Sequence, residues 1–149
     1  MMPQSPDFQE FINHLTDNAL QSLKHADAIA RSFNSPYICT EHLLLGVLAQ
    51  DSSMGAKVLE GSGVTLERAR MALNLTPKSI VINMGAKGLS ETAKLTLRMA
   101  YELAQQFDQE FCGTEHILYS ILSQKNARAT TLLRDMNINT DTVTAGIEQ

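Results

Sequence analysis

The tripeptide Thr-Glu-His occurs twice in this sequence, at residues 40–42 and 114–116, each time directly before an apolar run. A carboxylate presented at such a point can bind a cationic group. Guanidinium fits best, because its planar fork of N–H groups can donate to both carboxylate oxygens. The sequence therefore predicts two related anionic sites, centred on Glu41 and Glu115.

A structural interpretation of the same motif remains open. Thr40 and Thr114 can cap the helix that each of them begins, and the glutamates then offset the positive end of the helix dipole. His42 in this case is a partly buried imidazole with its hydrogen bonds satisfied. The motif would then be a helix start that is used twice.

The neighbouring cysteines suggest two further chemistries. Cys39, His42, Cys112 and His116 offer the two sulfurs and two nitrogens of a zinc site, but the spacing is Cys-x-x-His in one copy and Cys-x-x-x-His in the other, which rarely converges on one tetrahedral point. A Cys-His nucleophile pair lacks a third group to orient the imidazole. We therefore expect no metal, no catalytic residue and two free thiols.

Bulk composition excludes several classes of protein. The 149 residues are 44% hydrophobic, enough for one packed domain, and the formal net charge is −4 with a pI near 5.5. The Lys and Arg residues are scattered, and there is no membrane-length apolar run, no secretion signal and no phosphate-binding loop. We expect a cytoplasmic protein that is not an enzyme, uses no cofactor, and binds neither nucleic acid nor membrane.

The two copies of the motif belong to a longer repeat. A shift of 74 residues aligns residues 15–69 with residues 89–143 without a gap, and most identical positions are apolar and three or four residues apart. This spacing predicts amphipathic helices in an internal duplication. Thr16 and Ser90 are predicted N-caps of the long helix that precedes each motif.

These patterns predict an all-α fold of about four helices in each copy, arranged as an eight-helix bundle with a pseudo-twofold axis. Repeat one is expected over about residues 11–74 and repeat two over about residues 89–148. The segment between them, residues 75–88, contains one proline and two glycines and is expected to be a linker. The whole chain, residues 1–149, is expected to be one domain.

The repeated sequences TEHLLLGVLAQ and TEHILYSILSQ, each followed by a second short helix and then by Gly63-Val64 or Asn137-Ile138, resemble the two Clp repeats of the Clp N-terminal domain. The resemblance covers nearly the whole chain and is to the ClpC and ClpA branch of the Clp AAA+ unfoldases. It implies a non-catalytic module that receives adaptor proteins and protein substrates for a Clp ATPase ring and a ClpP-type peptidase.

In ClpC-like members the glutamate of each motif belongs to a pocket that binds phosphorylated arginine. Members with this activity tend to have a basic residue two positions after the helix-start hydroxyl, where this chain has Asn18 and Thr92. Because Lys94 is close in sequence to Ser90, we expect the second site to tolerate a phosphate better than the first. The candidate ligand-binding residues are Glu41, Glu115, Thr40, Thr114, Thr16, Ser90 and Lys94.

The sequence is also consistent with a second function. The chain could instead be a free-standing accessory or regulatory subunit of the Clp protease. Sequence beyond Gln149 would separate the two hypotheses, because only an N-terminal domain continues into a phosphate-loop ATPase.

Overall fold

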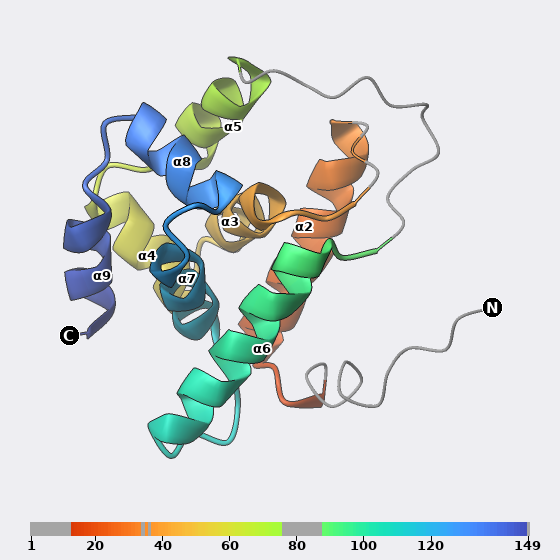
Figure 1. Ribbon diagram of the computed structural model, residues 1–149, viewed down its shortest axis with the longest axis vertical. Helices are drawn as coiled ribbons and strands as arrows, with labels where there is room; N and C mark the ends of the chain where they lie inside the picture. Colours follow the sequence, from red (N-terminus) through yellow and green to blue (C-terminus); the bar gives the residue numbers. More distant parts are fainter. Residues whose placement is uncertain (1–12, 34, 36, 76–87, 149) are drawn as a thin grey trace.

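The computed structural model describes residues 13–33, 35, 37–75 and 88–148, which form eight α-helices and no strand (Figure 1). Repeat one contributes α2 (Asp17–Ser32), α3 (Thr40–Ala49), α4 (Met54–Gly61) and α5 (Leu66–Leu75). Repeat two contributes α6 (Glu91–Gln106), α7 (Thr114–Ser123), α8 (Arg128–Asp135) and α9 (Thr140–Glu148). The all-α fold of two four-helix repeats is thus confirmed. The expected start near residue 11 and nearly all of the expected linker lie outside the described residues, and those boundaries stay predictions.

The two long helices begin where the sequence predicted. The Thr16 hydroxyl accepts a hydrogen bond from the Ala19 amide, and the Ser90 hydroxyl accepts one from the Ala93 amide, each at 3.1 Å. Each bond satisfies one of the amide groups that a helix leaves free in its first turn. These caps fix the start of α2 and α6 at equivalent positions of the two repeats.

The apolar helices α3 and α7 form the centre of the molecule. They contact each other, with α2 and α6 on one side and α4, α5, α8 and α9 on the other (Figure 1). Leu44, Leu45, Leu118 and Ile121 are completely buried. Helices that are apolar on most of their faces need such cover from all directions. The polar residues at the start of α3 and α7 are therefore held by a rigid core.

The two repeats interlock across a seam. Helix α3 packs on α8 of the other repeat, and α4 packs on α7. Two isolated parallel bridges, Leu15 with Cys112 and Ile38 with Leu89, join the segment before each long helix to the segment before the other repeat's motif. Each Thr-Glu-His helix start therefore faces residues of the opposite repeat.

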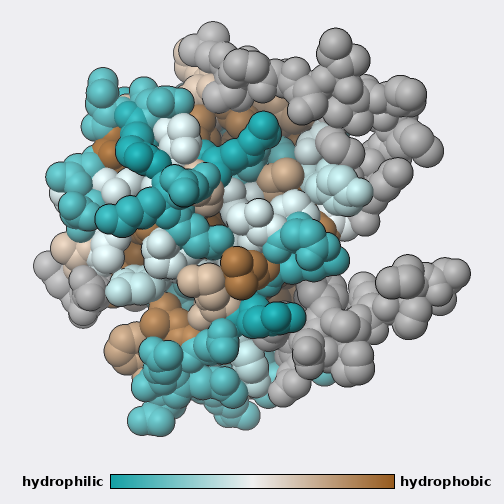
Figure 2. Space-filling view, in the orientation of Figure 1, coloured by the Kyte–Doolittle hydropathy of each residue, from teal (hydrophilic) through white to brown (hydrophobic). Residues whose placement is uncertain are grey.

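The face of the molecule drawn in Figure 2 has no large continuous apolar surface among the described residues. In the view of Figure 2 the described residues are mostly hydrophilic, and hydrophobic residues appear in separate patches. Among the described helices, none combines the length and the apolar character needed to cross a bilayer.

Candidate functional site

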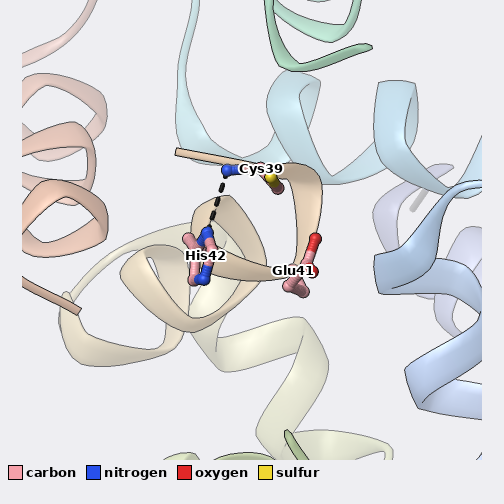
Figure 3. Close-up of side chains that lie close together, drawn as sticks. All are labelled: Cys39, Glu41 and His42. Carbon is pink, nitrogen blue, oxygen red and sulfur yellow. Dashed lines mark hydrogen bonds between the residues drawn. The ribbon is translucent and has the colours of Figure 1, made fainter. Parts of the chain in front are cut away.

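The histidine of each motif has a structural role. Nδ1 of His42 accepts a hydrogen bond from the backbone amide of Cys39 at 2.9 Å (Figure 3). Nδ1 of His116 accepts the equivalent bond from the amide of Gly113, also at 2.9 Å. Each ring closes the N-terminus of its own helix in the manner of one half of a capping box. Burial lowers the pKa of both imidazoles, although the neighbouring glutamate acts in the opposite direction. Both rings are therefore neutral near pH 7, with the proton on Nε2.

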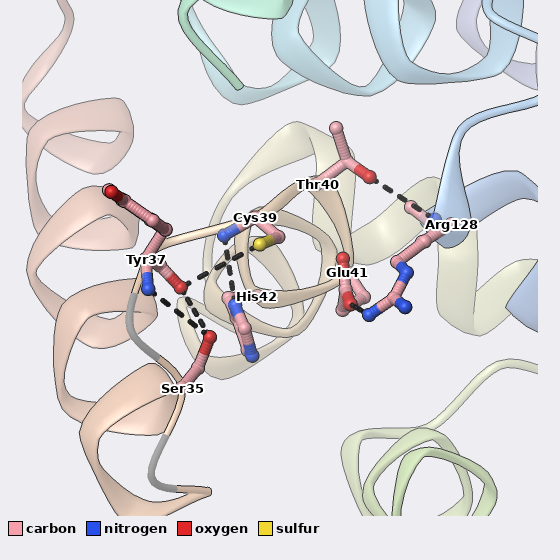
Figure 4. A network of polar contacts seen from close by, with 8 residues as sticks. Ser35, Tyr37, Cys39, Thr40, Glu41, His42 and Arg128 are labelled. Atoms are coloured by element: carbon pink, nitrogen blue, oxygen red, sulfur yellow. Dashed lines mark hydrogen bonds and ion pairs between the residues drawn. The ribbon is translucent and has the colours of Figure 1, made fainter. Parts of the chain in front are cut away.

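The threonine of each motif caps a helix of the other repeat. Oγ1 of Thr40 accepts a hydrogen bond from the Ala129 amide of α8 at 3.3 Å, and Oγ1 of Thr114 accepts one from the Gly55 amide of α4 at 2.9 Å (Figure 4 draws the Thr40 bond). The expectation that Thr40 and Thr114 cap their own helices was wrong. The N-caps of α3 and α7 are the preceding residues, Cys39 and Gly113. The presence of threonine in both copies of the motif is thus explained, because each threonine caps a helix of the other repeat.

The glutamates remain to be explained, and Glu41 is the more unusual of the two. Its side chain is only 5% exposed, and Oε2 lies 3.4 Å from a guanidinium nitrogen of Arg128 (Figure 4). Oε1 is buried and has no hydrogen-bond partner among the described residues. A buried carboxylate with so few hydrogen-bond partners is costly, so Glu41 is a group that can gain from a donor on a ligand.

Glu115 is placed differently. It is half-buried, and its carboxylate folds back over Gly113, so that a Cβ atom at position 113 would clash with Oε1 of Glu115. The first repeat has Cys39 at the equivalent position, and there the glutamate side chain lies beside Arg128 instead. The two glutamates are therefore equivalent in sequence but differ in their surroundings.

A pocket of about 580 Å³ surrounds the start of α3 and is called the Glu41 pocket below. It is lined by Cys39, Thr40, Glu41, Ser90, Thr92, Gln124, Lys125, Asn126, Ala127 and Arg128. The N-cap residues of α3, α6 and α8, which are Cys39, Ser90 and Ala127, are all part of this lining. Three helix N-termini thus point positive dipole ends toward one space, an arrangement that favours anions.

The packing of the two repeats places Ser90 near Glu41 and Thr16 near the second motif. The Ser90 amide donates to the Ile38 carbonyl at 2.9 Å, which places Ser90 in the Glu41 pocket. The Thr16 amide donates to the Cys112 carbonyl at 2.9 Å, so Thr16 lies in the segment next to the second motif. Each hydroxyl therefore accompanies the glutamate of the opposite repeat, whereas the sequence analysis had grouped Ser90 and Lys94 with the second site.

The cations of the Glu41 pocket are residues that the sequence analysis did not select. Lys125 and Arg128 line the pocket, whereas Lys94 does not and instead lies 3.5 Å from Glu91 on the surface of α6. Lys94 follows Ser90 on α6, and Ser90 lies beside the first motif, so the structure does not group Lys94 with Glu115. The preference of a phosphate for the second site stays a prediction. No local signal identified Lys125 or Arg128, because the packing of α8 on α3 is what brings Arg128 to Glu41 and this part of repeat two to the pocket.

Metal and thiol chemistry are both disfavoured by the geometry. Cys39, Glu41 and His42 have ligand atoms within 4.8 Å of one another, but Nδ1 of His42 already accepts the Cys39 amide (Figure 3). Burial, reinforced by the charge of Glu41, raises the pKa of the Cys39 thiol. Burial, with Glu115, raises the pKa of the Cys112 thiol to about 12. Protonated thiols are weak nucleophiles and weak metal ligands.

Comparison with known proteins identifies related sequences. The model of the Clp repeat (R) N-terminal domain matches residues 14–90 and 88–149. The ClpC ATP-binding subunit of the ATP-dependent Clp protease from Staphylococcus saprophyticus is 30% identical over 125 residues, covering 84% of this chain and 15% of the relative. The ClpA homolog of Trieres chinensis is also 30% identical over 125 residues, covering 83% of this chain and 14% of the relative. The chain thus spans about 15% of the length of these relatives.

Solved structures show the same fold. The N-terminal domain of ClpD from Arabidopsis thaliana superimposes with a TM-score of 0.79 at 23% identity, covering 92% of this chain and 96% of that one. The N-domain of ClpV from Vibrio cholerae gives a TM-score of 0.75 at 17% identity, covering 97% of this chain and 89% of that one. A complex of a ClpV N-domain with a VipB peptide gives 0.73 at 18% identity, covering 97% and 91%.

Proposed function

Because the chain belongs to the Clp repeat N-terminal domain family, we propose that it docks protein substrates and adaptor proteins for a Clp ATPase ring and the peptidase behind it. The family supports a recognition module without catalysis. The VipB peptide seated on a ClpV N-domain is a precedent for the capture of protein segments by this fold. The Glu41 pocket is the surface feature of this chain that such a segment would enter.

The ligand group that suits this pocket best is a phosphorylated arginine side chain. The observation that carries this proposal is the buried Glu41 carboxylate, which is under-partnered although it lies among cations and helix N-termini. A guanidinium would donate to Glu41, and its phosphate oxygens would accept from the first turns of α6 and α8 and from Lys125 and Arg128. A simple anion would bring no donor for Oε1 of Glu41.

Binding measured by calorimetry tests this proposal. The ligands are a short peptide with one phosphoarginine, the same peptide with arginine, and the same peptide with phosphoserine at that position. We expect the phosphoarginine peptide to bind and the phosphoserine peptide to bind at least about tenfold more weakly, because phosphoserine brings no donor for Glu41.

A variant that keeps the shape of the pocket makes the test specific. Glu41→Gln removes the charge but preserves the side-chain volume, and exposed Glu60→Gln on α4 is the matched control. We expect Glu41→Gln to lose at least about tenfold in affinity and Glu60→Gln to bind like the unmodified protein. Equal binding by both variants would exclude the Glu41 pocket as the site.

A further inference from the structure

The residues equivalent to those that line the Glu41 pocket are joined across the seam by the same kinds of hydrogen bond, around Glu115. The equivalents of Ser90 and Thr92 are Thr16 and Asn18. The hydrogen bonds that assemble the two places correspond pairwise. Ser90 to Ile38 matches Thr16 to Cys112, and the Ala129 to Thr40 bond matches the Gly55 to Thr114 bond.

The two places differ in charge. Lys125 and Arg128 line the Glu41 pocket, and the residues at the equivalent positions of the other repeat are Asp51 and Met54. The Glu41 pocket therefore combines two cations with one anion. On the other side the equivalent positions, together with Glu115, give two anions and no cation.

Arg128 is the residue that distinguishes the two sides most clearly. It brings a guanidinium of this chain to 3.4 Å from Oε2 of Glu41, although its own side chain is 69% exposed. Such an exposed partner contributes little stability and can move aside at low cost. An unphosphorylated arginine that entered the pocket would only exchange one guanidinium for another at Glu41.

A phosphorylated arginine changes this balance. When its guanidinium takes the place of Arg128 at Glu41, Arg128 is released beside the phosphate and gains a charge-assisted hydrogen bond to it. Lys125 and the N-termini of α6 and α8 favour the same anion. At the positions equivalent to Lys125 and Arg128, Asp51 would repel a phosphate and Met54 offers no donor.

We propose that Arg128, assisted by Lys125, makes the Glu41 pocket require a phosphate on the arginine and confines phosphoarginine to this one of the two pseudo-equivalent sites. The proposal rests on the function proposed above and adds a specificity-determining residue to it. It also predicts that one phosphoarginine peptide binds per chain.

Two substitutions test the proposal, each giving one position the residue found at its equivalent in the other repeat. Calorimetry with the phosphoarginine peptide and the matched arginine peptide would be carried out on the unmodified chain, on Arg128→Met and on Met54→Arg. Arg98→Met, which removes an exposed arginine of α6 outside the pocket lining, is the control. Because Arg128 and Met54 are both exposed, both exchanges should leave the fold intact, and thermal denaturation checks this.

The expected result is a change in selectivity. The unmodified chain should bind one phosphoarginine peptide, with an affinity at least about tenfold above that for the arginine peptide. Arg128→Met should reduce this ratio by about tenfold or more, through weaker phosphoarginine binding and stronger arginine binding, whereas Arg98→Met should leave it unchanged. Met54→Arg should raise phosphoarginine binding near Glu115.

Contrary results separate this inference from the proposed function. If the unmodified chain binds phosphoarginine but Arg128→Met keeps the same selectivity, or if two peptides bind with equal affinity, Arg128 does not set the specificity and only the inference fails. If the unmodified chain does not bind phosphoarginine, both the proposed ligand and the inference are overturned.

Discussion

Replacing Thr114 with valine removes one of the two hydrogen bonds by which each repeat caps a helix of the other. Valine has nearly the same shape as threonine, so the packing around α7 is kept while the acceptor is lost. The bond that disappears is the one from the Gly55 amide, which is buried and 2.9 Å long. The variant therefore isolates the contribution of this cross-repeat cap.

The structure sets the expected magnitude. Loss of a helix cap costs about 0.5–2 kcal/mol, and a buried donor left without an acceptor costs about 1–3 kcal/mol. No water can easily replace the hydroxyl, because Thr114 is 1% exposed and Gly55 is also buried. We expect Thr114→Val to lower the free energy of unfolding by about 1–3 kcal/mol.

Chemical denaturation measures this cost, and amide hydrogen exchange shows where it arises. The Gly55 amide should lose protection in Thr114→Val more than the other amides of α4 do. Thr131→Val, at an exposed position on α8, is the matched control and should cost less than about 0.5 kcal/mol. Equal costs for the two variants, or unchanged exchange at Gly55, would refute the cross-repeat cap.

Three further results are expected. Leu44→Ala should lower the free energy of unfolding by about 2–5 kcal/mol in chemical denaturation, because Leu44 is completely buried, and a cost below about 1 kcal/mol would contradict this packing. Gly46→Ala should strongly lower the melting temperature, since its Cβ would clash with a backbone carbonyl oxygen of α2, whereas Gly61→Ala should be tolerated because no atom lies within 4 Å of its Cβ. Burial lowers the pKa of His42 and His116 below the ordinary value for histidine. The unfolded chain therefore binds more protons than the folded chain as the pH falls, and the free energy of unfolding should decrease from about pH 7 to pH 5. A flat profile, or an unchanged slope in a variant with asparagine at both positions, would contradict that assignment.

Local patterns in the sequence were sufficient for the fold. The apolar spacing and the gapless repeat predicted helices at matched positions, and Thr16 and Ser90 were recognised as N-caps because a hydroxyl followed by an acid has a local meaning. The buried positions of α3 and α7 followed from their nearly continuous apolar residues. All these features depend on contacts within a few residues along the chain.

The site depended on contacts that the sequence did not reveal. The Thr40 hydroxyl caps Ala129, and Glu41 meets Arg128, across the seam between the repeats. Shifting the sequence on itself shows which residues are equivalent but not which residues touch. For this reason Ser90 was grouped with the wrong glutamate, and Lys125 was not selected at all.

The duplicated motif is now mostly explained by folding. The histidine closes its own helix and the threonine closes a helix of the other repeat, so both residue types are needed in both copies. The glutamates also lie in the first turns of α3 and α7, where a negative charge offsets the helix dipole, but Oε1 of Glu41 has no hydrogen-bond partner among the described residues. The functional interpretation therefore depends on Glu41 and on the unequal surroundings of Glu41 and Glu115.

Nuclear magnetic resonance of the isotope-labelled chain, titrated with the phosphoarginine peptide, shows where the phosphorylated arginine binds. If it enters the Glu41 pocket, the largest shifts should occur at the amides of Glu41, Thr92, Lys125 and Arg128, which line the pocket from both repeats. Shifts centred on a different pocket, between α6 and α7 around Leu103 and Tyr119, or no shifts at saturating peptide, would contradict binding in the Glu41 pocket.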